Sequence, residues 1–373
     1  MRIAIAGFAG LGLCLWAQTK SVTDAEVRRV HQSALLIDTH NDVTGETVKG
    51  LDIGPRRGKG HTDLARLREG SVGAVFFAAY VARTYDMQQQ SAHRALEMID
   101  TIRRDIVERY PNDFELALTA DEIIGARKKG RIAALIGIEG GHAIEDSLRL
   151  LRSYYALGVR YMTLTHSNHN RWADSSGSAG APNGGLSALG REIVGEMNRV
   201  GMMVDVSHVS DKTFWDVIET SKAPVFASHS SCRSLSRIPR NMSDEMIIAL
   251  AKKGGVIQVN FGCEFLSQAS ADTSPWSNPA RRGQPESATT RAKLEDVVAH
   301  IDHVVRIAGI DSVGIGSDFD GVSCTPVSLE DVSKFPNLTR ALLERGYTEG
   351  QIGKVYGGNL LRVMRAVEGV GGR

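Results

Sequence analysis

The chain has 373 residues, of which 42% are hydrophobic and 23% charged, a composition typical of a globular protein and not of a disordered one. Its formal net charge is +1, so no basic field favours binding to nucleic acid or to an anionic membrane surface. The length exceeds that of one ordinary domain, but it is common for a barrel of alternating strands and helices.

The N-terminus has the pattern of a secretory signal. Arg2 precedes an apolar run at 3–16, and the small residue Ala17 follows it. The run is too short to span a bilayer comfortably, and a buried first helix is the alternative. We interpret residues 1–19 as a signal peptide that is removed on export to the periplasm or the medium, and residues 20–373 as one mature domain.

The cysteines give no sign of a structural framework. Cys14 falls within the signal, and Cys232, Cys263 and Cys324 are scattered without a Cys-x-x-Cys pair. An odd number in the mature chain predicts no disulfide framework and no thiolate metal site. We expect each of them to be a small buried or half-buried residue.

Short runs of apolar and β-branched residues recur along the chain and predict strands. There are eight, at 35–42, 72–81, 132–141, 159–167, 201–209, 223–231, 254–262 and 311–321. Most are continuous apolar runs without alternation, which is typical of strands covered on both faces in a parallel sheet.

Segments with helical spacing lie before and between these runs. They are 21–34, 88–110, 144–158, 187–201, 210–222, 243–255 and 289–309, with one or two closing helices at 348–369. Strands alternating with helices predict an α/β protein with a (β/α)8 TIM-type barrel. A doubly wound open sheet is the alternative, but no Gly-rich stretch fits the strand-to-helix turn of that fold.

Ionisable side chains stand at the carboxyl ends of the predicted strands. These residues are His40, Asp42, Glu139, His166, His208, His229, Asp318 and Asp320. Active sites of such barrels lie at the carboxyl ends of the strands, so these groups should converge on one rim. Burying them together is costly unless they are paired or bind metal. The sequence therefore predicts a metal centre there.

The spacing within this set predicts two neighbouring metal sites that share one carboxylate. His40 and Asp42 are two residues apart, so both should point to the same side of the first strand. His208 and His229 come from neighbouring strands, and the Glu139 carboxylate could bridge two metals about 3.5–4 Å apart. Histidines combined with carboxylates favour zinc, although manganese or cobalt would also fit.

Other polar residues are assigned structural roles. Asp38 has the parity of the predicted ligands and should support one of them, whereas Asn41 has the opposite parity and should form a turn. The Ser-, Pro- and Gly-rich segment 266–290 is interpreted as a lid or a mobile insertion. Four histidines on helical patterns are predicted to lie at the surface, namely His31, His93, His300 and His303.

Seven motifs extend over most of the mature chain. In order they are "DTHND", "HTDLARLREGSVGAVF", "IGIEGGHAIEDSLRLLRSYYALGVRYMTLTHSN", "VDVSHVS", "SHSSCRSLSRIPRN", "GIGSDFDG" and "GGNLLRV". From about Leu35 to about Val367 the chain thus resembles the membrane dipeptidase (renal dipeptidase) family of zinc peptidases. The resemblance implies hydrolysis of small dipeptides with free amino and carboxyl ends, with tolerance of a D-residue at the carboxyl end.

The resemblance also implies a metal-binding role for five of the rim residues. His40 and Asp42 correspond to ligands of one zinc ion, and His208 and His229 to ligands of another. Glu139 corresponds to the carboxylate that bridges them, which gives about two zinc ions per chain. None of these five positions departs from the family pattern.

Three further residues correspond to family residues that face the substrate. His166 resembles the histidine beside the scissile bond, and Arg240 the arginine that holds the substrate carboxylate. Asp318 resembles the aspartate near the substrate amino group, to which a proton-transfer role is given. Phe77 is a departure, because many relatives have Trp there, and the disulfides and lipid anchor of the mammalian enzymes are not evident.

Two other classes of function are compared with this one. An amidohydrolase-type barrel would act on a lactone, phosphoester, cyclic amide or β-lactam, but such sites typically open with His-x-His and often use a bridging lysine. A binding or structural protein with this fold would be expected to lack a metal ligand, and here every ligand position is filled. The sequence leaves open whether the chain forms a homodimer.

Overall fold

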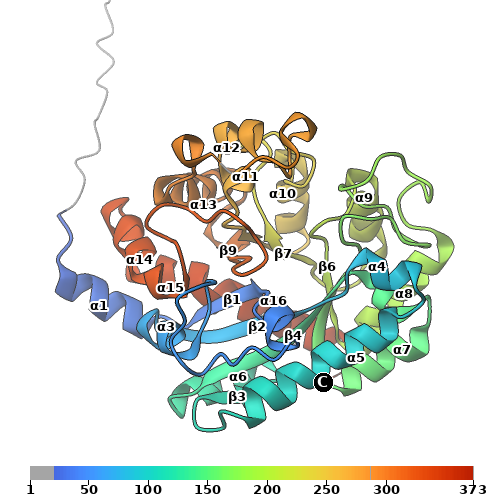
Figure 1. Ribbon diagram of the computed structural model, residues 1–373, viewed down its shortest axis with the longest axis horizontal. Helices are drawn as coiled ribbons and strands as arrows, with labels where there is room; N and C mark the ends of the chain where they lie inside the picture. Colours follow the sequence, from blue (N-terminus) through green and yellow to red (C-terminus); the bar gives the residue numbers. More distant parts are fainter. Residues whose placement is uncertain (1–20, 286, 373) are drawn as a thin grey trace, which may run out of the picture.

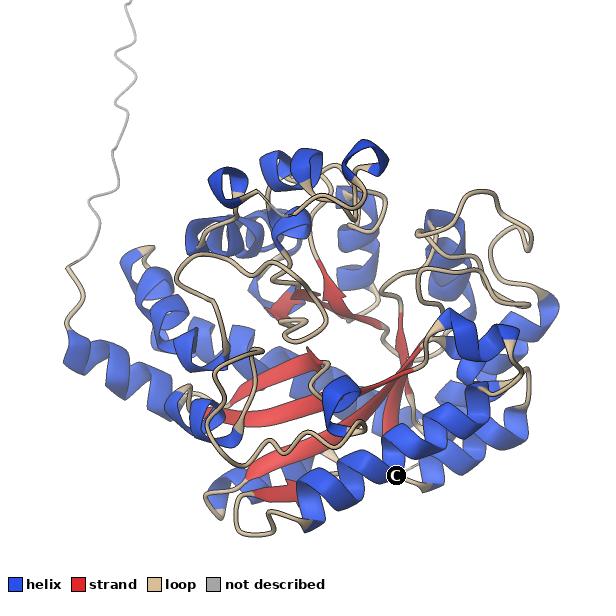
Figure 2. Ribbon diagram, viewed as in Figure 1, coloured by secondary structure: helices blue, strands red, loops and turns tan. Residues whose placement is uncertain are grey.

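The structure is a computed structural model that describes residues 21–285 and 287–372. Parallel strands lie at the centre and helices surround them (Figures 1 and 2). The strands are β1 (Leu36–Asn41), β2 (Val72–Tyr80), β3 (Phe114–Leu116), β4 (Ile132–Glu139), β5 (Val159–Thr163), β6 (Met203–Asp205), β7 (Phe226–Ser230), β8 (Val256–Val259) and β9 (Val313–Ile315). The proposed signal peptide lies outside the described residues.

The strands form a nearly closed barrel. Their order is β1-β2-β4-β5-β6-β7-β8-β9, and the short β3 pairs beside the first half of β4. At the carboxyl ends Asp42 N donates to Phe319 O at 2.8 Å and Asp318 N donates to His40 O at 3.0 Å, which joins the first strand to the last. The predicted TIM-type barrel and its eight strands are therefore confirmed, and the alternative fold, a doubly wound open sheet, is excluded. The short strand β3 was not predicted.

Sixteen α-helices are described around this barrel. They are α1 (Asp24–Ser33), α2 (Thr44–Thr47), α3 (Leu64–Glu69), α4 (Arg83–Met87), α5 (Ser91–Thr101), α6 (Ala120–Lys128), α7 (Leu148–Ala156), α8 (Ala188–Val200), α9 (Asp211–Thr220), α10 (Asp244–Lys252), α11 (Cys263–Leu266), α12 (Gln268–Thr273), α13 (Leu294–Ala308), α14 (Phe335–Glu344), α15 (Glu349–Gly353) and α16 (Asn359–Val370). Two π-helical turns, Ile102–Glu108 and Lys354–Gly358, continue α5 and α15.

Side-chain caps fix where the predicted helices begin and end. The Thr23 hydroxyl accepts a hydrogen bond from Glu26 N at 3.1 Å at the start of α1. Ser210 caps α9 in the same way, accepting from Thr213 N at 3.2 Å. Helix α8 ends at Gly201, whose φ of 83° is in the left-handed region that favours glycine. These local signals explain why the sequence pattern located these helices.

The barrel interior is filled by large side chains. The Tyr161 ring lies 5.1 Å from the Phe76 ring and 5.3 Å from the Phe226 ring, measured between centroids. These residues come from β5, β2 and β7, which are not neighbours in the sheet, so they meet inside the barrel. A larger hydrophobic cluster lies between the strands and the surrounding helices. Polar side chains lie instead at the mouth of the barrel, at the carboxyl ends of the strands.

The prediction that the chain contains no disulfide is wrong. Cys263 and Cys324 form a disulfide, with their Cα atoms 5.4 Å apart and a sequence separation of 61. They follow β8 and β9, which are neighbours in the barrel, and Cys263 N also donates to Cys324 O at 3.1 Å. Sequence spacing alone does not reveal that these two loops meet. Cys232 is a free, buried cysteine, as predicted.

Three of the four helical histidines are buried, which contradicts the prediction that they lie at the surface. Only His93 is exposed; His31, His300 and His303 are on inward faces of their helices. His31 illustrates why this is tolerated, because both ring nitrogens have partners, Thr339 Oγ1 at 2.7 Å and Gly70 O at 2.9 Å. The presence of a histidine in a helical pattern therefore does not identify the solvent-exposed face of the helix.

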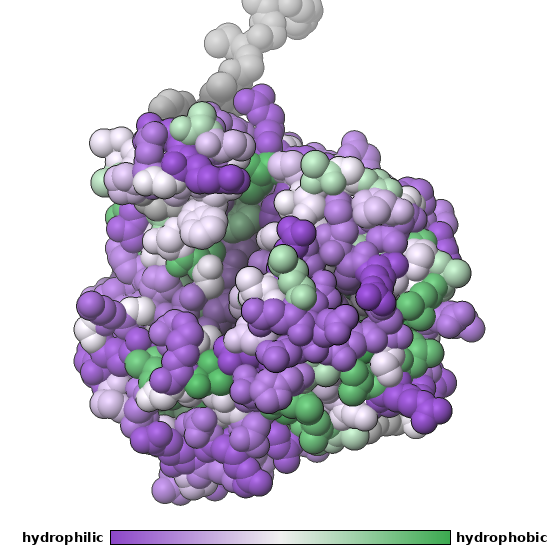
Figure 3. Space-filling model, turned by 45° about the vertical axis from the view of Figure 1, so that its right-hand side comes forward, coloured by the Kyte–Doolittle hydropathy of each residue, from purple (hydrophilic) through white to green (hydrophobic). Residues whose placement is uncertain are grey.

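The face of the molecule drawn in Figure 3 is mostly hydrophilic. Figure 3 shows one face with a hollow surrounded largely by hydrophilic residues. In the part of the chain that the structure describes, no helix has the length and apolar character needed to cross a membrane. Segment 266–290 contains α12 and two short 3-10 turns, Pro279–Arg281 and Ala288–Thr290, so its described part is folded.

Breaking the disulfide should destabilise the fold. The Cys263→Ser/Cys324→Ser double variant should lose about 2–4 kcal/mol of stability, because a closed loop of this size no longer restricts the unfolded chain. Calorimetric melting should show a lower midpoint for the double variant. A phosphine reductant should lower the midpoint of the native protein and leave that of the double variant unchanged. Equal midpoints for the native protein and the double variant would contradict this prediction.

Candidate metal centre

The predicted rim residues meet at the carboxyl ends of six strands. They follow or end β1 (His40, Asp42), β4 (Glu139), β5 (His166), β6 (His208), β7 (His229) and β9 (Asp318, Asp320), and Arg240 lies in the loop after β7. Seven of the eight predicted rim residues contact one another, whereas Asp320 forms hydrogen bonds with His61 instead. The strand-end rule therefore identified this cluster, although His40 and Asp318 are 278 positions apart in the sequence.

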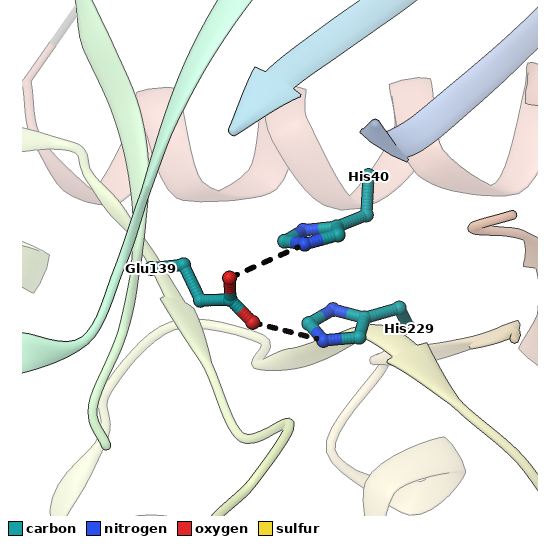
Figure 4. A group of neighbouring side chains, drawn as sticks. All are labelled: His40, Glu139 and His229. Atoms are coloured by element: carbon teal, nitrogen blue, oxygen red, sulfur yellow. Dashed lines mark ion pairs between the residues drawn. The ribbon is translucent and has the colours of Figure 1, made fainter. Parts of the chain in front are cut away.

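The Glu139 carboxylate lies at the centre of this cluster. Its Oε2 is 3.6 Å from His40 Nε2, and its Oε1 is 3.3 Å from His229 Nε2 (Figure 4). The same Oε1 is 3.0 Å from His208 Nε2. His166 Nε2 is 3.8 Å from the same Oε1. One oxygen thus faces the first strand and the other faces the histidines of later strands, which is the arrangement that a bridging carboxylate requires.

A second group of ligand atoms lies on the β1 side. His40 Nε2 is 3.2 Å from Asp42 Oδ2 and 4.0 Å from Asp318 Oδ1. Gly321 is required here, because a Cβ atom at this position would lie 2.4 Å from both carboxylates. His40, Asp42 and Asp318 therefore form a set of three possible metal ligands whose atoms all lie within 4.8 Å of one another.

Hydrogen bonds orient two of the histidine rings. His40 Nδ1 is 2.8 Å from the Tyr161 hydroxyl, which donates its own hydrogen to Thr39 O at 3.2 Å. The hydroxyl therefore accepts from Nδ1–H, and Nε2 of His40 keeps its lone pair for a metal. A glycine is needed opposite, since a Cβ on Gly137 would lie 2.0 Å from the Tyr161 ring.

A buried carboxylate performs the same task for His229. Its Nδ1 is 2.7 Å from Ser228 Oγ, and Ser228 Oγ donates to Asp205 Oδ2 at 2.6 Å. Asp205 also accepts from Ser207 N and Ser228 N, at 3.0 and 2.8 Å, so its position is fixed. The Nε2 atom of His229 is thereby left as an acceptor that points at Glu139.

The pKa shifts fit a cluster of metal ligands. Burial lowers the pKa of His208 and of His229 well below the usual value, which favours neutral imidazoles. Burial alone would raise the pKa of Glu139, but His40 and His166 hold it well below its usual range. Neutral imidazoles and an ionised carboxylate are the forms in which His208, His229 and Glu139 bind a metal ion. His40 differs, because burial lowers its pKa but Tyr161, Asp42 and Glu139 together hold that pKa well above the usual value, so this ring must lose a proton to bind a metal ion.

For Asp42 and Asp318, in contrast to Glu139, the surroundings raise the pKa and favour the protonated form. Burial raises the pKa of Asp42 and raises that of Asp318 well above its usual range. Asp42 and Glu139 raise the pKa of Asp318 further, because like charges at this spacing repel. A divalent cation among the three carboxylates would reverse this effect and favour their ionised forms.

These residues fit a metal ion. His40 Nε2 and Asp42 Oδ2 are buried and have no hydrogen-bond partner among the described residues, although each faces the centre of the cluster. Imidazole nitrogens and carboxylate oxygens are donors that zinc accepts. Two further three-residue sets, one of His40, Glu139 and His229 and one of Glu139, His166 and His208, share the Glu139 carboxylate.

Arg240 lies beside this cluster. Its Nη2 donates to His229 O at 2.7 Å and its Nη1 donates to Ser230 Oγ at 2.8 Å, so the guanidinium is held at the rim. Its Nε is buried and has no partner among the residues that the structure describes. Burial lowers the pKa of Arg240 to about 10, so the group still carries its charge at neutral pH.

Three of the eight described non-glycine residues with a positive φ lie at or beside the same rim. His208, Asp318 and Asp320 have φ values of 68°, 61° and 67°, in the left-handed region that non-glycine residues seldom adopt. Each such residue costs about 1 kcal/mol or more and persists where the surrounding structure holds it. Two of the three are proposed site residues, so the strain serves to place their side chains.

Asp38 and Asn41 behave largely as predicted. Asp38 is buried and accepts hydrogen bonds from Ser317 N and Ser317 Oγ at 2.8 and 2.6 Å, which holds the segment before Asp318. It thus supports a site residue through the backbone rather than through a ligand ring. Asn41 forms the predicted turn, with its Oδ1 accepting from Val43 N at 3.2 Å.

Several contributors to the site were missed from the sequence. Asn260 follows β8 and donates to Asp318 Oδ2 at 2.7 Å, and Tyr80 ends β2 with its ring 4.7 Å from that of His166. Applying the strand-end rule to every strand would have identified both. Tyr161 and Ser228 lie inside strands and have no comparable sequence signal.

Comparison with known proteins agrees with this geometry. The chain matches the family model of membrane dipeptidase (peptidase family M19) over residues 24–373. It is 43% identical over 351 residues to the dipeptidase verJ of Clonostachys rogersoniana, a match covering 90% of this chain and 84% of the relative.

Solved structures give the same result. The probable dipeptidase PvdM from Pseudomonas aeruginosa superposes with a TM-score of 0.82 at 26% identity, covering 93% of this chain and 98% of that one. A metallo peptidase from Rhodobacter sphaeroides, liganded with a phosphinate mimic of the dipeptide L-Ala-D-Ala, has a TM-score of 0.77 at 27% identity, covering 90% and 99%. The chain therefore belongs to the membrane dipeptidase family, peptidase family M19, whose members are metal-dependent dipeptidases.

Proposed function

We propose that this chain is a dinuclear zinc dipeptidase that hydrolyses dipeptides with free amino and carboxyl ends. The observation that carries the proposal is the position of Glu139, whose two oxygens face different histidines. In this proposal His40 and Asp42 hold one zinc ion, His208 and His229 hold the other, and Glu139 bridges them. Zinc bound there supplies a Lewis acid that polarises a peptide carbonyl and increases the acidity of water.

The surrounding side chains act on the substrate. His166, whose side chain is 22% exposed beside Glu139, can donate an N–H to the carbonyl oxygen as negative charge develops on it. Asp318 can accept the proton that water loses and deliver it to the leaving amine. Asn260 fixes the orientation of Asp318 during this transfer. The acid also attracts a free α-amino group, which accounts for the choice of an unblocked amino end.

Arg240 is proposed to hold the carboxyl end of the substrate. Its guanidinium is charged, tethered to the β7 end and has an unsatisfied Nε–H, so it is ready to bind a carboxylate through a fork of N–H groups. A cation at a fixed distance from the metal ligands limits the length of the peptide between them. This arrangement favours dipeptides over longer chains.

We also propose tolerance of a D-residue at the carboxyl end. The support comes from the Rhodobacter sphaeroides relative, whose ligand mimics L-Ala-D-Ala. The competing function, hydrolysis of a lactone, cyclic amide or β-lactam, has no observation of its own here. A panel of L-Ala-L-Ala and L-Ala-D-Ala with blocked-end controls distinguishes the two, because turnover of a lactone without turnover of either dipeptide would contradict our proposal.

Export of the chain is likewise a proposal. The apolar segment 3–16 has the features of a signal peptide, and the Cys263–Cys324 disulfide is of the kind that forms and persists outside the reducing cytosol. Both observations are consistent with a mature enzyme that acts in the periplasm or the medium.

Metal removal should abolish activity. Purified protein should contain about two zinc ions per chain and hydrolyse L-Ala-L-Ala, and a chelator should remove both the metal and the activity until zinc is added back. Metal analysis and a ninhydrin assay measure these outcomes. Full activity in metal-free protein would exclude the mechanism.

The Glu139→Gln variant tests whether the Glu139 carboxylate bridges two metal ions. The variant keeps the size of the side chain but lacks the second anionic oxygen, so kcat/KM should fall about a hundredfold or more and bound metal should decrease. Glu192→Gln is the matched control, because Glu192 is exposed on α8 and is not one of the proposed site residues. Normal metal content and turnover in Glu139→Gln would contradict the bridging role.

Arg240→Lys should weaken recognition of the substrate carboxylate. The point charge of lysine cannot reproduce the fork, so KM for L-Ala-L-Ala should rise about tenfold or more. The same change should not affect the slow hydrolysis of L-Ala-L-Ala amide, which lacks the carboxylate. Arg237→Lys in the same loop is the control, since that exposed side chain contacts Gln268. An equal loss of activity toward L-Ala-L-Ala and toward its amide would mean that Arg240 does not bind the substrate carboxylate.

The mature protein should begin near residue 20. N-terminal sequencing of protein recovered from the periplasm or medium should show the new terminus, and deletion of residues 2–19 should retain the protein in the cytosol. Recovery of full-length chains, starting at Met1, from the cytosol alone would exclude export.

A further inference from the structure

A basic cavity lies behind the rim, apart from the proposed metal ligands. Its volume is about 590 Å³, and its lining includes four arginines, Arg56, Arg57, Arg66 and Arg291. His61, Glu330 and Asp331 also contribute to the wall. Segments after β1, after β9 and from 287–291 enclose it. The net charge of the whole chain is only +1, so this concentration of guanidinium groups is local.

Two of the four arginines are already neutralised by carboxylates. Arg56 forms an ion pair with Glu69, and Arg66 pairs with Asp63 at 2.7 Å and with Asp331 at 3.2 Å. These pairs build the wall of the cavity. They contribute little net charge to its interior.

The other two arginines have no carboxylate partner among the described residues. Arg57 Nη1 is buried and has no hydrogen-bond partner there. Arg291 donates only to Thr325, through Nε to the carbonyl oxygen at 2.7 Å and through Nη2 to the hydroxyl at 3.5 Å. Both line the cavity, together with the carboxylate of Glu330, and they present guanidinium N–H groups that have no carboxylate acceptor within ion-pair distance among the described residues.

The cavity shares one turn with the reaction centre. Asp320 accepts from His61 N at 2.7 Å and its own N–H donates to His61 Nδ1 at 2.8 Å, which fastens the turn to the cavity wall. The other side of the turn carries Asp318 and Gly321, which lie against Asp42. A group bound in the cavity would therefore be held just beyond the proposed amino-end acid.

We propose that this cavity is an oxyanion-binding site for the carboxylate or phosphate group of a small molecule, held between Arg57 and Arg291. Guanidinium forks match the planar or tetrahedral oxygens of such groups, whereas an apolar or cationic ligand would leave the N–H groups of Arg57 and Arg291 without acceptors. The group can belong to an acidic side chain of a substrate at the rim or to a free anion. As a site for a free anion it extends beyond the proposed dipeptidase function, whereas as a site for a substrate side chain it rests on that function.

Direct binding of inorganic sulfate tests the site, because sulfate has the required oxygens and is a weak metal ligand. Calorimetric titration of the metal-loaded protein should detect binding, and Arg57→Gln and Arg291→Gln should each weaken it about tenfold or more. Arg149→Gln, an exposed arginine on α7, should bind sulfate as the native protein does. Circular dichroism spectra establish that the variants are folded.

The two sources of the anion give different kinetics. If the ligand is a substrate side chain, kcat/KM of Arg57→Gln should fall for L-Ala-L-Glu or L-Glu-L-Ala and remain unchanged for the Gln counterparts. If it is a free anion, sulfate affinity should fall while all four dipeptides react as with the native enzyme. The proposal is overturned if the native protein binds no sulfate up to about 10 mM, or if Arg57→Gln and Arg291→Gln bind it as tightly as the native protein.

Discussion

The buried negative charge of Glu139 is the constraint on which the rim depends. A carboxylate that is 4% exposed is stable only when cationic or hydrogen-bonding partners surround it. His40, His208 and His229 supply these partners from β1, β6 and β7, and none of them is near Glu139 in the sequence. They reach it only when the strands close into a barrel. The site therefore exists only when the barrel is closed.

The histidines are useful as ligands only because the layer beneath them is fixed. Tyr161 inside the barrel determines which nitrogen of His40 carries hydrogen, and Asp205 does the same for His229 through Ser228. This layer has its own steric requirement, since a side chain at position 137 would displace the Tyr161 ring. The packing that fills the barrel thus also determines which ring nitrogens of the proposed metal ligands carry hydrogen.

The parts of the structure that the sequence predicts are those with a local signal. Continuous apolar runs identified the eight barrel strands, and a polar residue at the end of each run identified His40 and Glu139. Contacts between loops have no such signal, which is why the Cys263–Cys324 disulfide was missed. Irregular strand pairing has no such signal either, as in the register shift between Asp38 and Asn41 where β1 pairs with β2.

The turn at 318–321 connects these features. It contains two residues, Asp318 and Asp320, in left-handed backbone conformations that each cost about 1 kcal/mol or more. Hydrogen bonds from both sides hold it, since Asp318 N donates to His40 O and Asp320 N donates to His61 Nδ1. The turn places the Asp318 carboxylate among the proposed metal ligands and the Asp320 carboxylate beside His61 in the cavity wall. Because one turn carries both, an anion bound at Arg57 would lie beside the segment that positions Asp318.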